Sequence, residues 1–168
     1  MPLPLTIILT LALDDASQKY FTSLRDRYFP KHCNYLPAHL TLFHKLPASN
    51  FSVEEGIKAC CKKPPFEIEI TGIKNMHTGA AFEIQSARLQ QLHEEMQQKL
   101  SPYLISNDRK KLWPHITIQN KVTAFKAAQT IAALQQNFTP FSAQAIGIDS
   151  WLYVNGPWQK QAEYRFEN

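Results

Sequence analysis

Two short segments carry the side chains best suited to acid–base chemistry, and both have the form His-x-Thr. The first contains His39 and Thr41, and the second contains His115 and Thr117. Because imidazole titrates near neutral pH, one neutral histidine can accept a proton from water while a protonated one donates to a leaving oxygen. Threonine hydroxyls can donate hydrogen bonds to phosphate oxygens as negative charge develops on them. The two motifs therefore predict phosphoester cleavage by paired histidines, with the threonines on the phosphate and with no metal or cofactor.

The first motif lies in a segment expected to form a strand, in which residues i and i+2 point to the same face. Phe43 and Lys45 would then share the face of His39 and could contact the substrate. His44 would point the opposite way, so it is not expected to take part. The histidines farther along the chain, His77 and His93, fit no ligand spacing and are expected to be exposed to solvent.

The second motif is preceded by a basic and aromatic segment. Arg109 and Lys111 could contact phosphates, and Trp113 could stack on a base as in proteins that bind single-stranded RNA. The competing interpretation is a solvated basic loop with Trp113 packed in the core. Lys121, after the motif, would lie on the same face as His115 and is a further candidate contact.

The chain also repeats itself, because the two motifs lie 76 residues apart within matching patterns of apolar residues. A second match follows in the same order after a slip of one residue. There Pro65 and Phe66 align with residues 140–141, and residues 72–73 align with residues 147–148. Two matches in the same order indicate a duplicated unit.

Hydrophobic periodicity and turn signals predict the order β-α-β-α-β twice, followed by an extra C-terminal strand. The expected strands are 5–11, 39–45, 66–74, 81–85, 115–119, 145–154 and 164–166, and the expected helices are 14–28, 52–62, 87–104 and 125–137. We expect an α+β fold in a single domain, 1–168, made of two pseudo-symmetric lobes. The lobes, about 1–76 and 77–168, would carry mainly antiparallel sheets that face a central groove.

Composition narrows the class of protein only slightly. The net charge of +4 favours anionic partners weakly, and 44% hydrophobic residues are ordinary for a globular chain. The three cysteines form no Cys-x-x-Cys pair, which favours a reducing cytoplasm over a disulfide framework. The apolar run at residues 3–13 is too short to span a membrane, so no membrane partner is expected. No long heptad pattern is present, and a monomer is expected.

At the two motifs, and in its duplicated layout, the chain resembles the two-histidine phosphoesterase superfamily. Within it, the chain is most similar to the branch of 2′-5′ RNA ligase-like proteins and cyclic phosphodiesterases. The resemblance implies a bilobal α+β fold and metal-independent chemistry on RNA ends or nucleotides. It also implies that His39 protonates the leaving oxygen, that His115 is the base for water, and that Thr41 and Thr117 hold the phosphate.

Three functions remain open from the sequence. The first is hydrolysis of 2′,3′-cyclic phosphates on RNA ends or nucleotides. The second is cleavage or joining of 2′-5′ linked oligonucleotides by the same groups. The third is a non-catalytic module that binds RNA or nucleotides, which the presence of all four motif residues disfavours.

Overall fold

The computed structural model describes residues 2–167 and shows the predicted order of strands and helices. The strands are β1 (Thr6–Leu13), β2 (Leu40–Pro47), β3 (Phe66–Asn75), β4 (Ala80–Gln85), β5 (His115–Gln119), β6 (Phe141–Tyr153) and β7 (Gln159–Arg165). The helices are α1 (Asp15–Tyr28), α2 (Phe51–Cys60), α3 (Ala87–Lys99) and α4 (Ala124–Gln135), with short 3₁₀ turns η1 (Lys31–Cys33), η2 (Ser101–Tyr103) and η3 (Ser106–Arg109). Each α-helix begins after a capping side chain, and α2 uses Asn50, whose amide oxygen accepts from the Val53 backbone.

All strand pairs are antiparallel and belong to one sheet with the order β2-β1-β6-β3-β4-β5, to which β7 adds on β6. If β1, β2 and β3 are taken as equivalent to β4, β5 and β6, this order reads the same from either end. The end strands β2 and β5 also contact each other, so the sheet curls until its edges meet. The mainly antiparallel α+β fold is therefore confirmed, and the symmetry fits the duplicated unit.

The expected boundary between two lobes, near residue 76, does not divide the sheet into two parts, so this prediction is wrong for the sheet. It falls within the hairpin of β3 and β4, which pair directly. Strand β1, from the first half of the chain, pairs with β6, from the second half. Each half of the sheet therefore contains a strand from the other repeat, because β3 and β6 are exchanged between the repeats.

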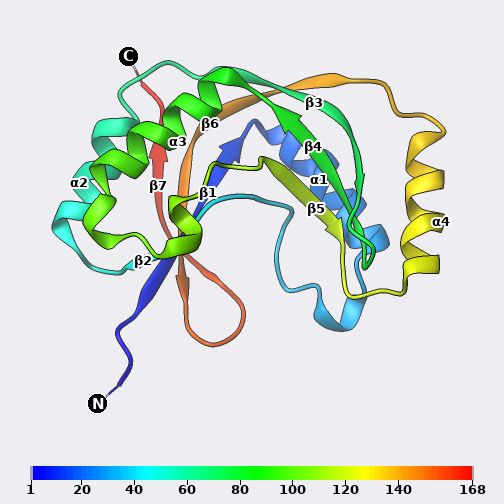
Figure 1. The fold of residues 1–168 in the computed structure, drawn as a ribbon, viewed down its shortest axis with the longest axis horizontal. Helices are drawn as coiled ribbons and strands as arrows, with labels where there is room; N and C mark the ends of the chain where they lie inside the picture. The colour runs from blue at the N-terminus through cyan, green and yellow to red at the C-terminus, as the bar shows by residue number, and fades with distance from the viewer. Residues whose placement is uncertain (1, 168) are drawn as a thin grey trace.

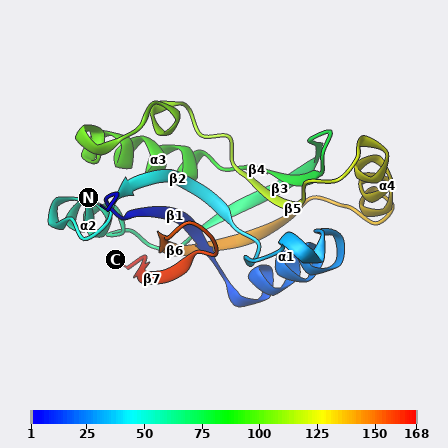
Figure 2. The ribbon, with the colours of Figure 1, turned by 90° about the horizontal axis from the view of Figure 1, so that it is seen from below.

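The helices cover the two ends of the curved sheet (Figures 1 and 2). α2 and α3 lie at one end, and α1 and α4 lie at the other. At the second end a cluster of aromatic rings joins α1 to the sheet, with Phe21 in edge contact with Phe82 and stacked on Phe141. No helix within residues 2–167 is long and apolar enough to cross a bilayer.

Both His-x-Thr strands contain a β-bulge at the same position. Thr41 pairs with Thr10 but Phe43 pairs with Leu9, so Leu42 is an extra residue in β2. On β5, Thr117 pairs with residue 81 and Gln119 with residue 80, so Ile118 is the extra residue. A bulge reverses the alternation of side chains in the residues after it. The side chain two places beyond each threonine therefore no longer points to the same face as the motif histidine and threonine.

Candidate active site

The two motif histidines are held in the same way at the starts of neighbouring edge strands. The Nδ1 of His39 is 2.9 Å from the carbonyl oxygen of Pro37, and the Nδ1 of His115 is 2.8 Å from that of Trp113. A carbonyl can only accept, so each Nδ1 carries the proton and each Nε2 is free to accept one.

The motif threonines lie half-buried on the strands that the histidines begin. Thr41 is opposite Thr10 of β1, whose hydroxyl accepts a hydrogen bond from the Trp151 indole at 2.8 Å. The Thr117 hydroxyl is 3.9 Å from the sulfur of Met76, a weak partner that a phosphate oxygen could displace. The structure thus brings the two motifs together at the seam between β2 and β5.

Both catalytic candidates have lowered pKa values. Burial lowers the pKa of His39 to about 4, with the carbonyl of Pro37 opposing the shift and the charges of Arg25 and His115 adding to it. Burial also lowers the pKa of His115, against the effect of the Trp113 carbonyl, and the charge of His44 adds to the lowering. In the free protein both imidazoles are therefore neutral at pH 7. An anionic phosphate between them would favour protonation of one.

A buried arginine that the sequence did not single out lies against the second motif. Arg25 of α1 is 5% exposed and donates to the backbone oxygen of Thr117 at 3.2 Å and to the Asn34 side chain at 2.9 Å. Its guanidinium lies 4.0 Å from the centre of the Phe29 ring. Arg25 is one helical turn from the buried Phe21, and this spacing is the sequence signal that could have placed it on the inner face.

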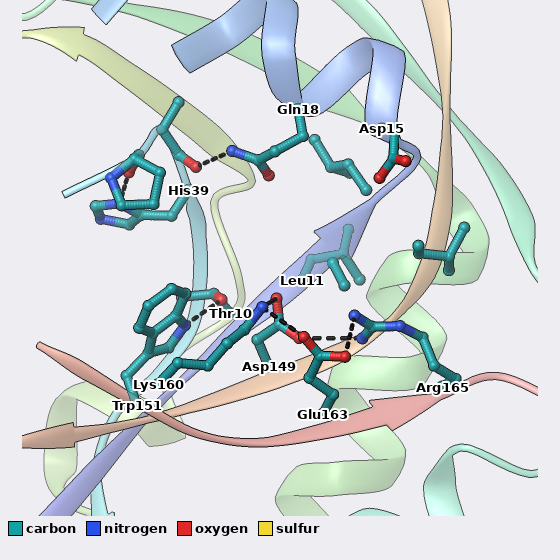
Figure 3. Close-up of a pocket in the computed structure, with 15 residues that line it drawn as sticks. Thr10, Leu11, Asp15, Gln18, His39, Asp149, Trp151, Lys160, Glu163 and Arg165 are labelled. Atoms are coloured by element: carbon teal, nitrogen blue, oxygen red, sulfur yellow. Dashed lines mark hydrogen bonds and ion pairs between the residues drawn. The ribbon is translucent and has the colours of Figure 1, made fainter. Parts of the chain in front are cut away.

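A cavity of about 250 Å³ opens beside His39 (Figure 3). Its walls come from β1, β6, β7 and α1. On α1 the Gln18 amide donates to the backbone oxygen of Ala38 at 2.7 Å, which fixes the segment that precedes His39. Across the cavity an ion-pair network of two cations and two anions follows β6 and β7; its members are Asp149, Lys160, Glu163 and Arg165. Because these charges balance one another, the network is suited to holding β7 in place rather than to attracting an anion.

Two tryptophans flank the histidines. Trp113 is 45% exposed and stacks on His115 with ring centres 3.9 Å apart, so the alternative of a core anchor is wrong. On the other side the Trp158 ring lies 4.7 Å from that of His39. Trp158 was missed because it is remote in sequence and no local pattern marks it.

The predicted basic contacts Arg109, Lys111 and Lys121 do not line the cavity beside His39. The Arg109 guanidinium donates to the Ser101 oxygen at 2.8 Å and lies among residues of α3 and η2. Lys111 is exposed on the loop before β5. Lys121 is exposed just past the end of β5 and has a positive φ of 60°, so it does not continue the face of His115.

The expectations that Phe43 contacts the substrate and that His93 is exposed are both wrong, and the two side chains pack on each other. The bulge at Leu42 turns Phe43 inward, where it is fully buried and stacks on His93 with ring centres 4.7 Å apart. His93 is 3% exposed rather than solvated, and its Nε2 is 3.0 Å from the Leu42 oxygen. Gln119, at the equivalent position of β5, is also fully buried.

The side-chain direction expected for His44 is wrong as well. A second irregularity in the pairing of β1 with β2 lies between Phe43 and Leu46 and leaves both His44 and Lys45 exposed. The structure places His44 close enough to His115 to lower its pKa. Lys45, a predicted contact, lies beside His44 on the wall of a second cavity that also includes Trp158.

The lowered pKa values predict an unusual pH profile. Catalysis by a proton donor and a proton acceptor needs one protonated and one neutral histidine. Since both pKa values lie below the ordinary value of about 6.5, the singly protonated form of the free protein is lost as pH rises through that region. We expect kcat/KM to be highest on the acid side of 6.5 and to decline again as His39 is protonated near pH 4. A profile of kcat/KM against pH, taken between the limits of acid unfolding, measures this; an optimum at pH 8 would contradict it.

Comparison with known proteins agrees with the fold and with the family that the sequence resembles. The family model of the 2′-5′ RNA ligase superfamily matches residues 13–157, and the chain therefore belongs to that family of two-histidine phosphoesterases. No curated protein matches the chain in sequence.

Several solved structures share the fold. Escherichia coli LigT, crystallised with 3′-AMP, is 14% identical with a TM-score of 0.62, and the match covers 99% of this chain and 100% of that one. TT0787 of Thermus thermophilus is 15% identical with a TM-score of 0.64, over 96% and 97% of the two chains. Usb1 of Kluyveromyces marxianus is 12% identical with a TM-score of 0.52, over 95% and 97%. At these identities the likeness establishes the fold alone.

Within residues 2–167, His, Cys, Asp and Glu side chains nowhere form a group of three that could hold a metal ion. The three cysteines are unpaired, and burial raises the pKa of Cys61 to about 12.

Proposed function

We propose that this protein is a metal-independent phosphoesterase that hydrolyses 2′,3′-cyclic phosphates of RNA ends or nucleotides. The observation that carries the proposal is the matched pair of imidazoles, each with Nδ1 bound to a carbonyl oxygen and Nε2 left free. Membership of the 2′-5′ RNA ligase superfamily supports phosphoester chemistry. The LigT structures with 3′-AMP, ATP and NADP⁺ support a nucleotide as the ligand of this groove.

In the proposed reaction a water oxygen bonds to phosphorus as its proton passes to Nε2 of His115. The bond from phosphorus to one ribose oxygen breaks, and that oxygen takes the proton from Nε2 of His39. Thr41 and Thr117 donate to the non-bridging oxygens while charge develops on them. The product is a nucleoside 2′- or 3′-monophosphate with a free hydroxyl beside it. The unpaired cysteines favour a reducing compartment such as the cytoplasm for this activity.

The test is hydrolysis of the four nucleoside 2′,3′-cyclic phosphates and of an RNA oligomer ending in a cyclic phosphate, all in excess EDTA. We expect turnover in the chelator, and chromatography of the product isomers identifies the oxygen that leaves. Activity that disappears in EDTA and returns with a divalent cation would contradict the proposed mechanism. A folded protein that leaves every cyclic phosphate intact, yet cleaves 2′-5′ linked oligonucleotides, would replace the proposed substrate.

A further inference from the structure

A buried carboxylate holds an exposed histidine next to the site. Asp108 of η3 has a fully buried side chain that accepts from the backbone nitrogens of His44 at 2.9 Å and Lys45 at 3.1 Å. It also accepts from Nδ1 of His44 at 3.0 Å, which leaves Nε2 of that ring free. The His44 side chain is 57% exposed. The irregular end of β2 is thus fixed by one carboxylate that orients an imidazole outward.

The same pairing favours the protonated form of this imidazole. The hydrogen bond from His44 to Asp108 raises the pKa of His44, with burial opposing it and the charge of Asp108 adding to it. The neighbouring Lys45 contributes a second cation on the same cavity wall. A protonated imidazole with a free N–H is a strong donor to a phosphate oxygen.

His44 is linked to both proposed catalytic histidines. Its charge lowers the pKa of His115. It also lines a cavity of about 540 Å³ together with Trp158, whose ring lies 4.7 Å from His39. At about 3.3 Å per residue, the five residues from His39 to His44 span about 16 Å of strand, less the shortening at the bulge. A single group of a small ligand could not bridge this distance. The cavity at His44 is therefore an extension of the site at His39, not a second copy of it.

The lining of this cavity suits a nucleotide. Its apolar and aromatic wall can pack against a ribose and base, and His44 and Lys45 supply its cations. The apolar and aromatic wall includes Leu5, Ile8, Tyr153, Val154 and Trp158. Among its described lining residues there is no carboxylate, in contrast with the balanced ion pairs of the cavity in Figure 3. The Asp108 carboxylate that pairs with His44 is fully buried, so an anion at this wall meets the exposed imidazole and Lys45 rather than a carboxylate.

We propose that His44, held by Asp108, binds a second phosphate of the substrate, one or two nucleotides away from the phosphate between His39 and His115. The proposal rests on the proposed function for the position of the reacting phosphate. It deepens that function by favouring oligonucleotide ends over single nucleotides.

Binding without turnover tests the proposal independently of hydrolysis. The probes are uridine 3′-phosphate and the 3′-phosphorylated di- and triuridylates, titrated by calorimetry in EDTA at low, constant salt. The variant is His44→Gln, whose neutral amide can still donate to Asp108, and the matched control is His32→Gln at an exposed histidine outside both cavities. Thermal unfolding of all three proteins establishes that they are folded.

For the wild type and His32→Gln, we expect the first or the second added nucleotide to tighten binding by about tenfold or more, the effect of a charged hydrogen bond. For His44→Gln that step should vanish while the affinity for uridine 3′-phosphate stays unchanged. A step that persists in His44→Gln would overturn the proposal. So would an equal loss of affinity for all three probes, since His44 would then act on the reacting phosphate. Failure of hydrolysis alone would count against the proposed function and leave this binding result standing.

Discussion

Replacing either His39 or His115 with alanine is expected to reduce kcat on a 2′,3′-cyclic phosphate by about 10²–10⁴-fold, the usual contribution of a positioned acid or base. Both side chains are partly exposed and each makes one hydrogen bond to a nearby carbonyl. Stability should therefore change little. Initial rates at saturating substrate, with the thermal midpoint of each variant, measure the two effects.

The double variant and a control at another histidine show whether the loss of kcat is specific to the two motif histidines. Because the two histidines act on one transition state, the double variant should be little worse than the poorer single variant. His32→Ala, at an exposed histidine outside the site, should keep wild-type kcat. Wild-type turnover in either single variant of a motif histidine would rule out the two-histidine mechanism.

A substrate with a good leaving group would assign the roles of the two histidines. A p-nitrophenyl phosphodiester needs no proton on its leaving oxygen, so removal of the acid should cost far less there than on a ribose leaving group. The family resemblance assigns the acid to His39, so it predicts that His39→Ala keeps much more activity on the p-nitrophenyl substrate than on a cyclic phosphate; this is the rescue. Burial lowers the pKa of His39 to about 4, which disfavours its protonated form in the free protein. Rescue of His115→Ala instead would show that the burial of His39 has exchanged the roles.

The sequence predicted the motifs and the order of the elements because both depend on local periodicity. Alternating apolar residues marked the strands, and the repeated spacing marked the two motifs as equivalent. The exchange of β3 and β6 between repeats was not predictable in this way, since a pattern of alternation carries no information about which strand is the neighbour.

The errors on β2 have one physical origin. A bulge adds a single residue to a strand, and no distinctive amino acid marks it in the sequence. The side chains of the residues after it then point to the opposite face of the sheet. Leu42 is such a residue, so Phe43 lies in the core and His44 lies near the site, the reverse of the prediction. The partners that fix these positions are far away in sequence: Asp108 is 64 residues from His44. Only the tertiary structure brings them together.

Replacing Arg25 with methionine is expected to destabilise the protein and to move its pH profile. The change leaves the Thr117 oxygen and the Asn34 side chain without their charged donor, at roughly 1–3 kcal/mol for each unsatisfied group. For a chain of this size each kcal/mol lowers the thermal midpoint by about 2–4 °C. The positive charge of Arg25 also lowers the pKa of His39. Its removal should raise that pKa and shift the acid limb of kcat/KM to higher pH.

Arg25→Lys separates these two effects. Lysine keeps the charge but cannot donate to Thr117 and Asn34 with the same planar fork, nor cover the Phe29 ring as a guanidinium does. We therefore expect Arg25→Lys to lose stability while the acid limb stays at the wild-type position. If both variants shift that limb equally, the cause is displacement of β5 rather than charge. An unchanged limb in Arg25→Met would mean that burial alone holds the pKa of His39 low, and Arg25 would then serve only to tie α1 to the second motif.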